Sequence, residues 1–158
     1  MQFLVLPARG EFRERLLGLT LEERARRMLR AAGLAEASEW AGAGPLVIFP
    51  GERVGPGALG KEIAAVEAGP EAVVALDPAS GAGGRPVLVL GEAARNRLAA
   101  GAGDLDGLLA DALAAVGERR PIRVPTAEVL DRRGAAGARA LLLQALRKPI
   151  DGLEQQGP

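Results

Sequence analysis

The feature that most constrains the fold is the start of the chain, where a short apolar run, an arginine-containing loop and a well-marked helix follow one another. Residues 3–6 are apolar without polar alternation, which is typical of a strand covered on both faces of an α/β sheet. The helix is expected to begin after Thr20, because Thr20 and Glu23 have the spacing of a capping box. Gly33 is expected to end it.

The rest of the chain repeats this alternation of apolar runs and helical patterns. Further strands are predicted at 46–49, 72–76, 86–90 and 122–124. Further helices are predicted at 56–68, 92–100 and 104–116, with a last one from 125 onward. Together they predict one α/β domain over 1–147, a Rossmann-like three-layer sandwich with a mostly parallel sheet of about five strands. Residues 148–158 are expected to form a C-terminal tail.

Missing residue types exclude several kinds of chemistry. The chain has no Cys, His or Tyr, which removes thiol nucleophiles, zinc–thiolate sites and the commonest general base. The only serines, Ser38 and Ser80, do not lie in a Gly-x-Ser-x-Gly motif. The remaining carboxylates, arginines and lysines suit magnesium-assisted phosphoryl or nucleotidyl transfer, or no catalysis.

Charge and hydropathy limit the partners. Lys plus Arg and Asp plus Glu are 20 each, and aromatic residues are only 3%, so binding of nucleic acid is not expected. No apolar run approaches the length of a transmembrane helix, and the first residues do not have the pattern of a signal peptide. The expected location is the cytoplasm, including the inner face of the membrane.

The loop after the first predicted strand is the candidate phosphate site. A glycine-rich turn before a helix lets backbone N–H groups approach a phosphate. Here the turn is Pro7 to Arg13, which has one glycine and a proline without an N–H group. The backbone cradle is therefore expected to be poor, and the candidate phosphate contacts are Arg9, Gly10 and Arg13.

This opening resembles a known family. The sequence LVLPARGEFRERL, followed by GLTLEERARRMLRAAGL, resembles the start of sugar-phosphate nucleotidylyltransferases, in which a strand runs into an LAAGxGxRL-type loop. Gly10 and Arg13 stand in roughly the matching places, whereas the lysine of the family is missing. The resemblance implies a nucleotidyltransferase-like fold in which the loop holds a nucleoside triphosphate.

Two acidic residues are candidate metal ligands. The family has a strand ending in Gly-Asp that supplies a magnesium-binding aspartate, and PGERV places Glu52 at that corner. Asp77 follows the strand predicted at 72–76, at the kind of strand end where open α/β sheets bind ligands. The alternatives are an exposed Glu52 paired with Arg53, and an Asp77 that makes a turn into Pro78. The Glu52 and Asp77 carboxylates are expected to lie too far apart to share one ion.

The end of the chain carries a second resemblance. Residues 146–152, LRKPIDG, resemble the signature that precedes the first membrane helix where nucleotidyltransferase-like domains are fused to CDP-alcohol phosphatidyltransferases, including relatives of di-myo-inositol-phosphate-phosphate synthase. The resemblance implies a membrane phosphatidyltransferase domain or subunit as partner, with a homodimer as a further expectation. Arg139, Arg147 and Lys148 are expected either to attract an anionic leaflet or to complement the dipole of the last helix.

Two hypotheses about function follow. The first is a catalytically vestigial nucleotidyltransferase-like domain that positions, regulates or assembles a CDP-alcohol phosphatidyltransferase of phospholipid synthesis. The alternative is an active cytidylyltransferase that makes a CDP-alcohol from CTP and a phosphorylated polyol, with Mg²⁺ and CTP as its cofactors and with Arg9, Arg13, Glu52 and Asp77 as its site. The missing glycines and lysine favour the first.

Overall fold

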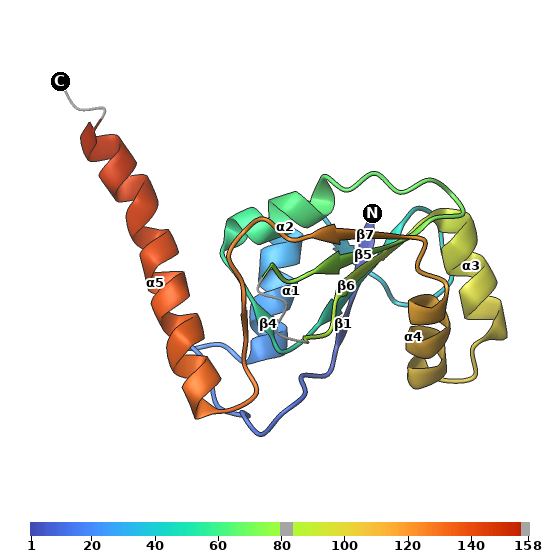
Figure 1. Cartoon of the computed structure of the whole chain (residues 1–158), viewed down its shortest axis with the longest axis horizontal. Helices are drawn as coiled ribbons and strands as arrows, with labels where there is room; N and C mark the ends of the chain where they lie inside the picture. The colour runs from blue at the N-terminus through green and yellow to red at the C-terminus, as the bar shows by residue number, and fades with distance from the viewer. Residues whose placement is uncertain (80–83, 156–158) are drawn as a thin grey trace.

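The structure is a computed structural model that describes residues 1–79 and 84–155, with side chains described through residue 146. It is a mixed α/β fold built on a six-stranded sheet (Figure 1). The strand order is β2-β1-β3-β6-β5-β7. The strands are β1 (Gln2–Leu6), β2 (Ala35–Glu36), β3 (Leu46–Pro50), β5 (Val73–Asp77), β6 (Val87–Leu90) and β7 (Glu118–Pro121).

The sheet is mostly parallel, with one exception. β1 is parallel to β2 and β3, and β5 is parallel to β7, but β6 is antiparallel to both of its neighbours. The cause is the connection between β5, which ends at Asp77, and β6, which begins at Val87. It is too short for the crossover that a parallel pair requires, so the two strands form a hairpin.

Helices cover both faces of the sheet. They are α1 (Leu21–Ala31), α2 (Gly57–Ala64), α3 (Glu92–Gly101), α4 (Leu105–Ala114) and α5 (Arg132–Gln155). Phe3 and Val5 of β1 pack in the same core cluster as residues of α1 and α2, whereas Leu6 packs with residues of α3 and α4. Side chains alternate in this way along β3, β5 and β6 as well. The predicted mixed α/β fold with a mostly parallel sheet is therefore confirmed.

Helix starts follow the sequence signals closely. The Thr20 hydroxyl accepts a hydrogen bond from the Glu23 amide at 3.2 Å, as the capping box predicts. The Asp104 carboxylate accepts from the Gly107 amide at 2.7 Å at the start of α4. α2 is shorter than predicted, because it begins after Pro56 and ends at Ala64.

The segment between α4 and α5 corrects two predictions. The fifth predicted strand, 122–124, lies just after the observed β7, whose four residues are exposed at the edge of the sheet. Because an exposed edge strand carries charged residues and no apolar pattern, its sequence does not indicate a strand. The last helix does not begin at 125, because Ala127–Glu128 form β8, which pairs with β4 (Arg53–Val54). Asp131 instead caps α5, accepting from the Gly134 amide at 2.9 Å.

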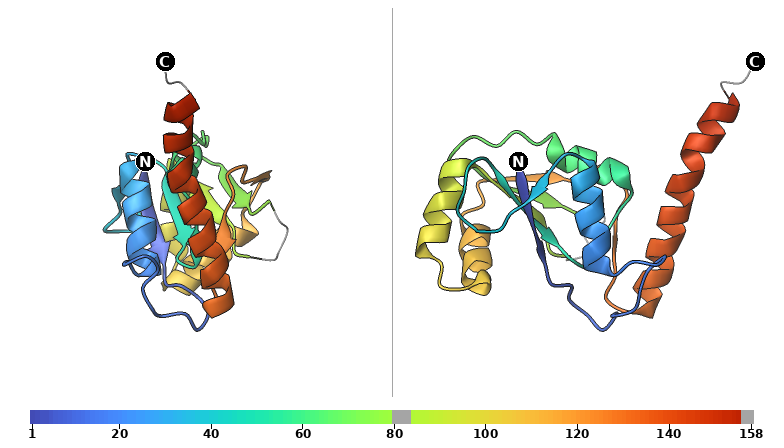
Figure 2. Two further views of the ribbon diagram at one scale, coloured as in Figure 1. Left: turned by 90° about the vertical axis from the view of Figure 1, so that its left-hand side faces the viewer. Right: turned by 180° about the vertical axis from the view of Figure 1, so that it is seen from behind.

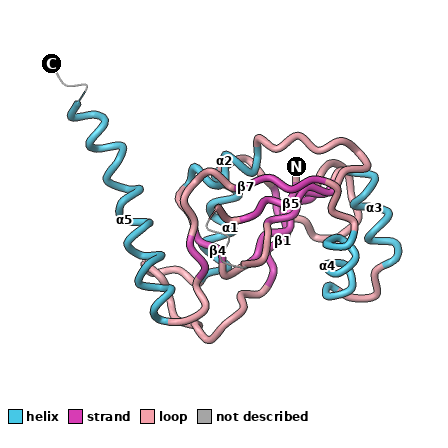
Figure 3. The backbone as a smooth tube through the Cα atoms, viewed as in Figure 1, coloured by secondary structure: helices cyan, strands magenta, loops and turns pink. Residues whose placement is uncertain are grey.

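α5 packs on the body only through its first turns. Ala135, Ala138 and Leu142 lie in a third core cluster with Phe12 and Leu16 of the loop after β1. The rest of the helix leads away from the sheet (Figure 2, Figure 3). Since α5 continues to Gln155, the predicted boundary after residue 147 falls inside a helix. None of the described helices has both the length and the apolar character needed to cross a membrane.

Candidate functional site: an arginine–glutamate cluster

Glu52 is the centre of the candidate site. It lies in the turn between β3 and β4, and its side chain is only 1% exposed. The Arg85 guanidinium donates to both carboxylate oxygens, Nε to Oε2 at 2.8 Å and Nη2 to Oε1 at 2.5 Å. Arg9 also donates to both, through its backbone N–H to Oε1 at 3.1 Å and through Nε to Oε2 at 3.2 Å. Four N–H donors thus surround one buried carboxylate.

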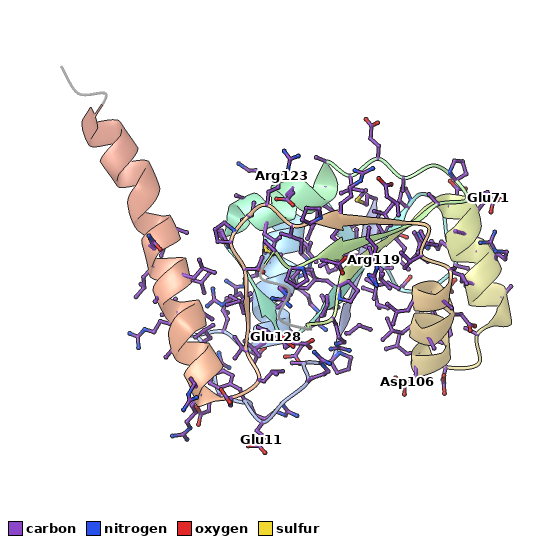
Figure 4. The ribbon with its side chains drawn as sticks, in the orientation of Figure 1. Glu11, Glu71, Asp106, Arg119, Arg123 and Glu128 are labelled. Atoms are coloured by element: carbon purple, nitrogen blue, oxygen red, sulfur yellow. The ribbon has the colours of Figure 1, made fainter. Side chains whose placement is uncertain are left out.

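A second carboxylate extends this network toward β8. Arg9 Nη2 donates to Glu128 Oε1 at 2.6 Å, and Arg53 Nη2 lies 3.9 Å from Glu128 Oε2. Figure 4 shows Glu128 near the end of the sheet, on the segment that leads to α5. We call Arg9, Glu52, Arg53, Arg85 and Glu128 the arginine–glutamate cluster. Its three guanidinium groups exceed its two carboxylates by one charge.

The cluster keeps Glu52 ionised. Burial alone would raise the pKa of this carboxyl, but hydrogen bonds from the Arg85 side chain and the Arg9 amide outweigh burial and lower the pKa to about 2. For Arg53, burial lowers the pKa, whereas the negative charges of Glu128 and Glu52 act to raise it. At neutral pH Glu52 is therefore a fixed negative charge, and it compensates part of the positive charge of the arginines.

The backbone N–H groups of the candidate phosphate loop donate hydrogen bonds within the protein. The Ala8 amide donates to Glu22 Oε1 at 3.0 Å and the Arg9 amide donates to Glu52. The amides of Glu11 and Phe12 both donate to the Leu130 carbonyl, at 2.7 and 3.3 Å. A phosphate in this loop would have to displace the chain's own acceptors.

The three predicted loop residues have different surroundings. Arg9 lies in the cluster, whereas Arg13 is exposed and donates to the Phe12 carbonyl at 3.2 Å. Gly10 has φ +88°, and a Cβ atom there would lie 2.4 Å from the Leu130 oxygen. The glycine therefore allows the loop to dock against the segment that precedes α5, and it does not face an open phosphate site.

Replacing Gly10 by alanine is expected to lower the free energy of unfolding by about 3 kcal/mol, because a positive φ is strained for alanine and its Cβ would collide with backbone. Gly18 is the matched control, since it has φ +87° and open space around it. Gly18→Ala should cost only about 1 kcal/mol. Urea unfolding of both variants measures the difference, and equal losses would contradict the close docking of Gly10.

Glu52 and Asp77 are not brought together. Asp77 pairs with Arg119 of β7 at 3.2 Å, and the partners of the Glu52 carboxylate are Arg9 and Arg85. β6 lies between the strands that precede these residues, which separates the two strands by two spacings, or about 10 Å. Within residues 1–79 and 84–146, no group of three or more His, Cys, Asp or Glu side chains is placed to hold a metal ion.

The alternative prediction for Glu52, an exposed residue paired with Arg53, is wrong. Glu52 is buried rather than exposed, and Arg53 pairs with Glu128 rather than with Glu52. Two members of the cluster, Arg85 and Glu128, were not predicted from the sequence. Arg85 follows a glycine-rich stretch and Glu128 lies in a region predicted as helix, so neither has a local signal.

The fold and the cluster define a mixed α/β protein with a buried set of ion pairs at the carboxyl ends of β1 and β3. No protein-family model matches the chain, and no curated protein is significantly similar to it. Inferences about its function therefore depend on the geometry of the arginine–glutamate cluster.

Proposed function

We propose that this chain is a non-catalytic nucleotidyltransferase-like domain. The observation that carries the proposal is the burial of Glu52 among the cations and amides that would otherwise meet a nucleotide. The Glu52 carboxylate takes the place of a bound anion. The loop after β1 thus has a structural role, in which it joins β3, β8 and the start of α5.

Energetics support this assignment. To bind a triphosphate, Arg9 and Arg85 would have to leave Glu52, and a buried carboxylate without its partners costs about 3–5 kcal/mol. Glu11 and Glu128 would add repulsion against the phosphates. The cost of breaking these ion pairs would offset the free energy gained when the nucleotide binds.

The Rossmann-like and nucleotidyltransferase-like assignment of the fold is part of this proposal. It is supported by the opening strand, loop and helix and by the three layers around a mostly parallel sheet. The resemblance of the opening sequence adds to that support. No observation favours the active cytidylyltransferase, because the residues proposed for its magnesium site pair with arginines.

The proposed role is to position, regulate or assemble a CDP-alcohol phosphatidyltransferase at the inner face of the membrane. The support is the LRKPIDG resemblance at 146–152, on the outer part of α5. The side chains of Arg147 and Lys148 lie outside the described residues. Co-expression with such an enzyme and purification in detergent tests the association, and complete separation of the two proteins would contradict it.

CTP with magnesium is expected to bind this chain with a Kd of about 1 mM or weaker, because Arg9 and Arg85 already pair with the chain's own carboxylates. Isothermal titration calorimetry measures this affinity. Glu52→Gln should bind CTP more tightly than the wild type, since it frees Arg85 and leaves Arg9 with Glu128 as its one carboxylate partner, provided that circular dichroism shows a folded variant. A micromolar Kd for the wild type that weakens in Arg13→Ala would overturn the non-catalytic assignment and favour the cytidylyltransferase.

A further inference from the structure

A cavity of about 380 Å³ lies between α1, the start of α2 and the part of α5 that leaves the body. Its walls are mainly apolar and are formed by Leu17, Leu19, Met28, Leu142 and Leu146. The volume falls in the range of small-molecule binding sites, which are mostly apolar with a few converging polar groups. The cavity is separate from the arginine–glutamate cluster and shares no residue with it.

Two arginines of α1 supply the polar groups. Arg24 and Arg27 both line the cavity. Among the described side chains, no carboxylate lies within ion-pair distance of either guanidinium. Arg24 donates through Nη2 to the carbonyls of Leu16 and Leu17, while its Nε is buried without a hydrogen-bond partner. The cavity thus has positive charge that the described carboxylates do not neutralise.

The two cations oppose each other. Burial lowers the pKa of Arg24, and repulsion from Arg27 lowers it further. An anion placed near both guanidinium groups would relieve this repulsion. Charge-assisted hydrogen bonds of this kind are stronger than those between neutral groups.

The start of α2 adds a third electropositive feature. Gly55, Pro56 and Gly57 line the cavity, and no side chain caps the first turn of this helix. Free N–H groups and the helix dipole favour an anion at such a terminus. Gly57 is exposed, and a Cβ atom there would meet nothing within 4 Å, so the backbone at this residue is open to a ligand.

We propose that this cavity binds a monomeric, single-chain amphiphile with a carboxylate or phosphate head group. The head lies between Arg24, Arg27 and the start of α2, and the alkyl chain lies against Leu17, Met28 and Leu146. The tail would cover Leu146, which is 66% exposed. An uncharged apolar ligand would leave both arginines without a counter-ion, and a free inorganic anion would leave the apolar walls exposed to water.

The test is a titration of the ¹⁵N-labelled chain with decanoate, below its critical micelle concentration, followed by NMR. Saturable shifts are expected at the amides of Gly57 and Met28. Arg27→Gln should weaken decanoate binding at least tenfold, and Ala145→Phe, which fills the cavity from α5, should abolish it. Arg30→Gln is the matched control, because it removes the same charge one turn further along α1, outside the cavity.

Several results would overturn the proposal. Equal weakening by Arg27→Gln and Arg30→Gln would mean non-specific ion pairing. Equal affinity for decanoate and 1-decanol would mean that the head group is not recognised. Shifts that appear only with phosphatidylglycerol vesicles would mean that this face meets a bilayer, and shifts that depend on protein concentration alone would mean that a second copy covers it.

Discussion

Glu52→Gln is expected to lower the free energy of unfolding by about 4 kcal/mol at pH 7. The substitution keeps the shape of the side chain but removes its charge, so Arg9, which is 44% exposed, and Arg85, which is 21% exposed, lose their shared buried counter-ion. Breaking a buried ion pair by removing one partner typically costs 3–5 kcal/mol, because the remaining charges stay desolvated. Urea unfolding followed by circular dichroism measures the loss.

Glu36→Gln is the matched control. Glu36 also pairs with two arginines, Arg26 at 2.8 Å and Arg30 at 2.7 Å, but its side chain is 35% exposed. Solvent screens exposed pairs, so this variant should lose about 1 kcal/mol or less. Similar losses for Glu52→Gln and Glu36→Gln would mean that burial does not strengthen the arginine–glutamate cluster.

The same carboxylate predicts a pH dependence. Its pKa falls from the usual 4.5 to about 2 on folding, so the unfolded chain takes up a proton more readily than the folded one. The stabilisation is complete above pH 4.5 and is lost as the pH falls toward 2, by about 3 kcal/mol in total. Unfolding measured from pH 7 to pH 2 should show this decline in the wild type and a weaker decline in Glu52→Gln.

The elements that the sequence predicts well are those with a strong local pattern. The strands β1, β3, β5 and β6 are apolar runs buried on both faces, and burial of that kind leaves only apolar residues. α1 is marked by its cap and its periodic apolar face. The edge strand β7 and the two-residue strands β2 and β8 have no such pattern, because they bury little apolar surface.

The candidate site is harder to predict because it depends on strand direction. The antiparallel β6 pairs Ile48 with Leu88, which brings Arg85, just before β6, to the end of β3 where Glu52 lies. If β6 were parallel to β3, Arg85 would lie at the opposite edge of the sheet. Glu128 reaches the cluster from 119 residues beyond Arg9, through the β4–β8 pairing. Contacts between residues so far apart in the sequence produce no local sequence pattern.

The loop after β1 has a structural role in the proposed non-catalytic domain. The loop after β1 still approaches an anion, but the anion is the chain's own Glu52. The Leu130 carbonyl takes two more of its amides. The loop thereby fastens β8 and the start of α5 to the sheet, a structural role that a bound nucleotide would disrupt.

Arg95→Ala is expected to be as damaging as Glu52→Gln, with a loss of about 4 kcal/mol. Arg95 lies in α3 and is 1% exposed. Its guanidinium donates to five backbone carbonyls, those of Glu39, Trp40, Ala41, Ala43 and Gly44, at 2.6 to 3.3 Å. In Arg95→Ala these carbonyls lose their hydrogen-bond donor. Each carbonyl that water does not reach then costs about 1–3 kcal/mol, because it stays desolvated without a partner.

The loop from 39 to 44 has no regular secondary structure. Besides Arg95, two side chains of α3 hold it: Asn96 donates to the Gly42 carbonyl at 3.0 Å, and Glu92 accepts from the Gly44 amide at 3.1 Å. Arg95→Ala should therefore loosen the loop before the sheet unfolds. Trp40 is the only tryptophan, and its fluorescence should change in the folded variant and report a separate, earlier transition in urea. Arg97→Ala, on the same helix but paired only with Glu71 at the surface, should cost about 1 kcal/mol or less and leave that fluorescence unchanged. An Arg95→Ala variant with wild-type stability and emission would show that water replaces the guanidinium at no cost, and the loop would then have to be held by its other contacts.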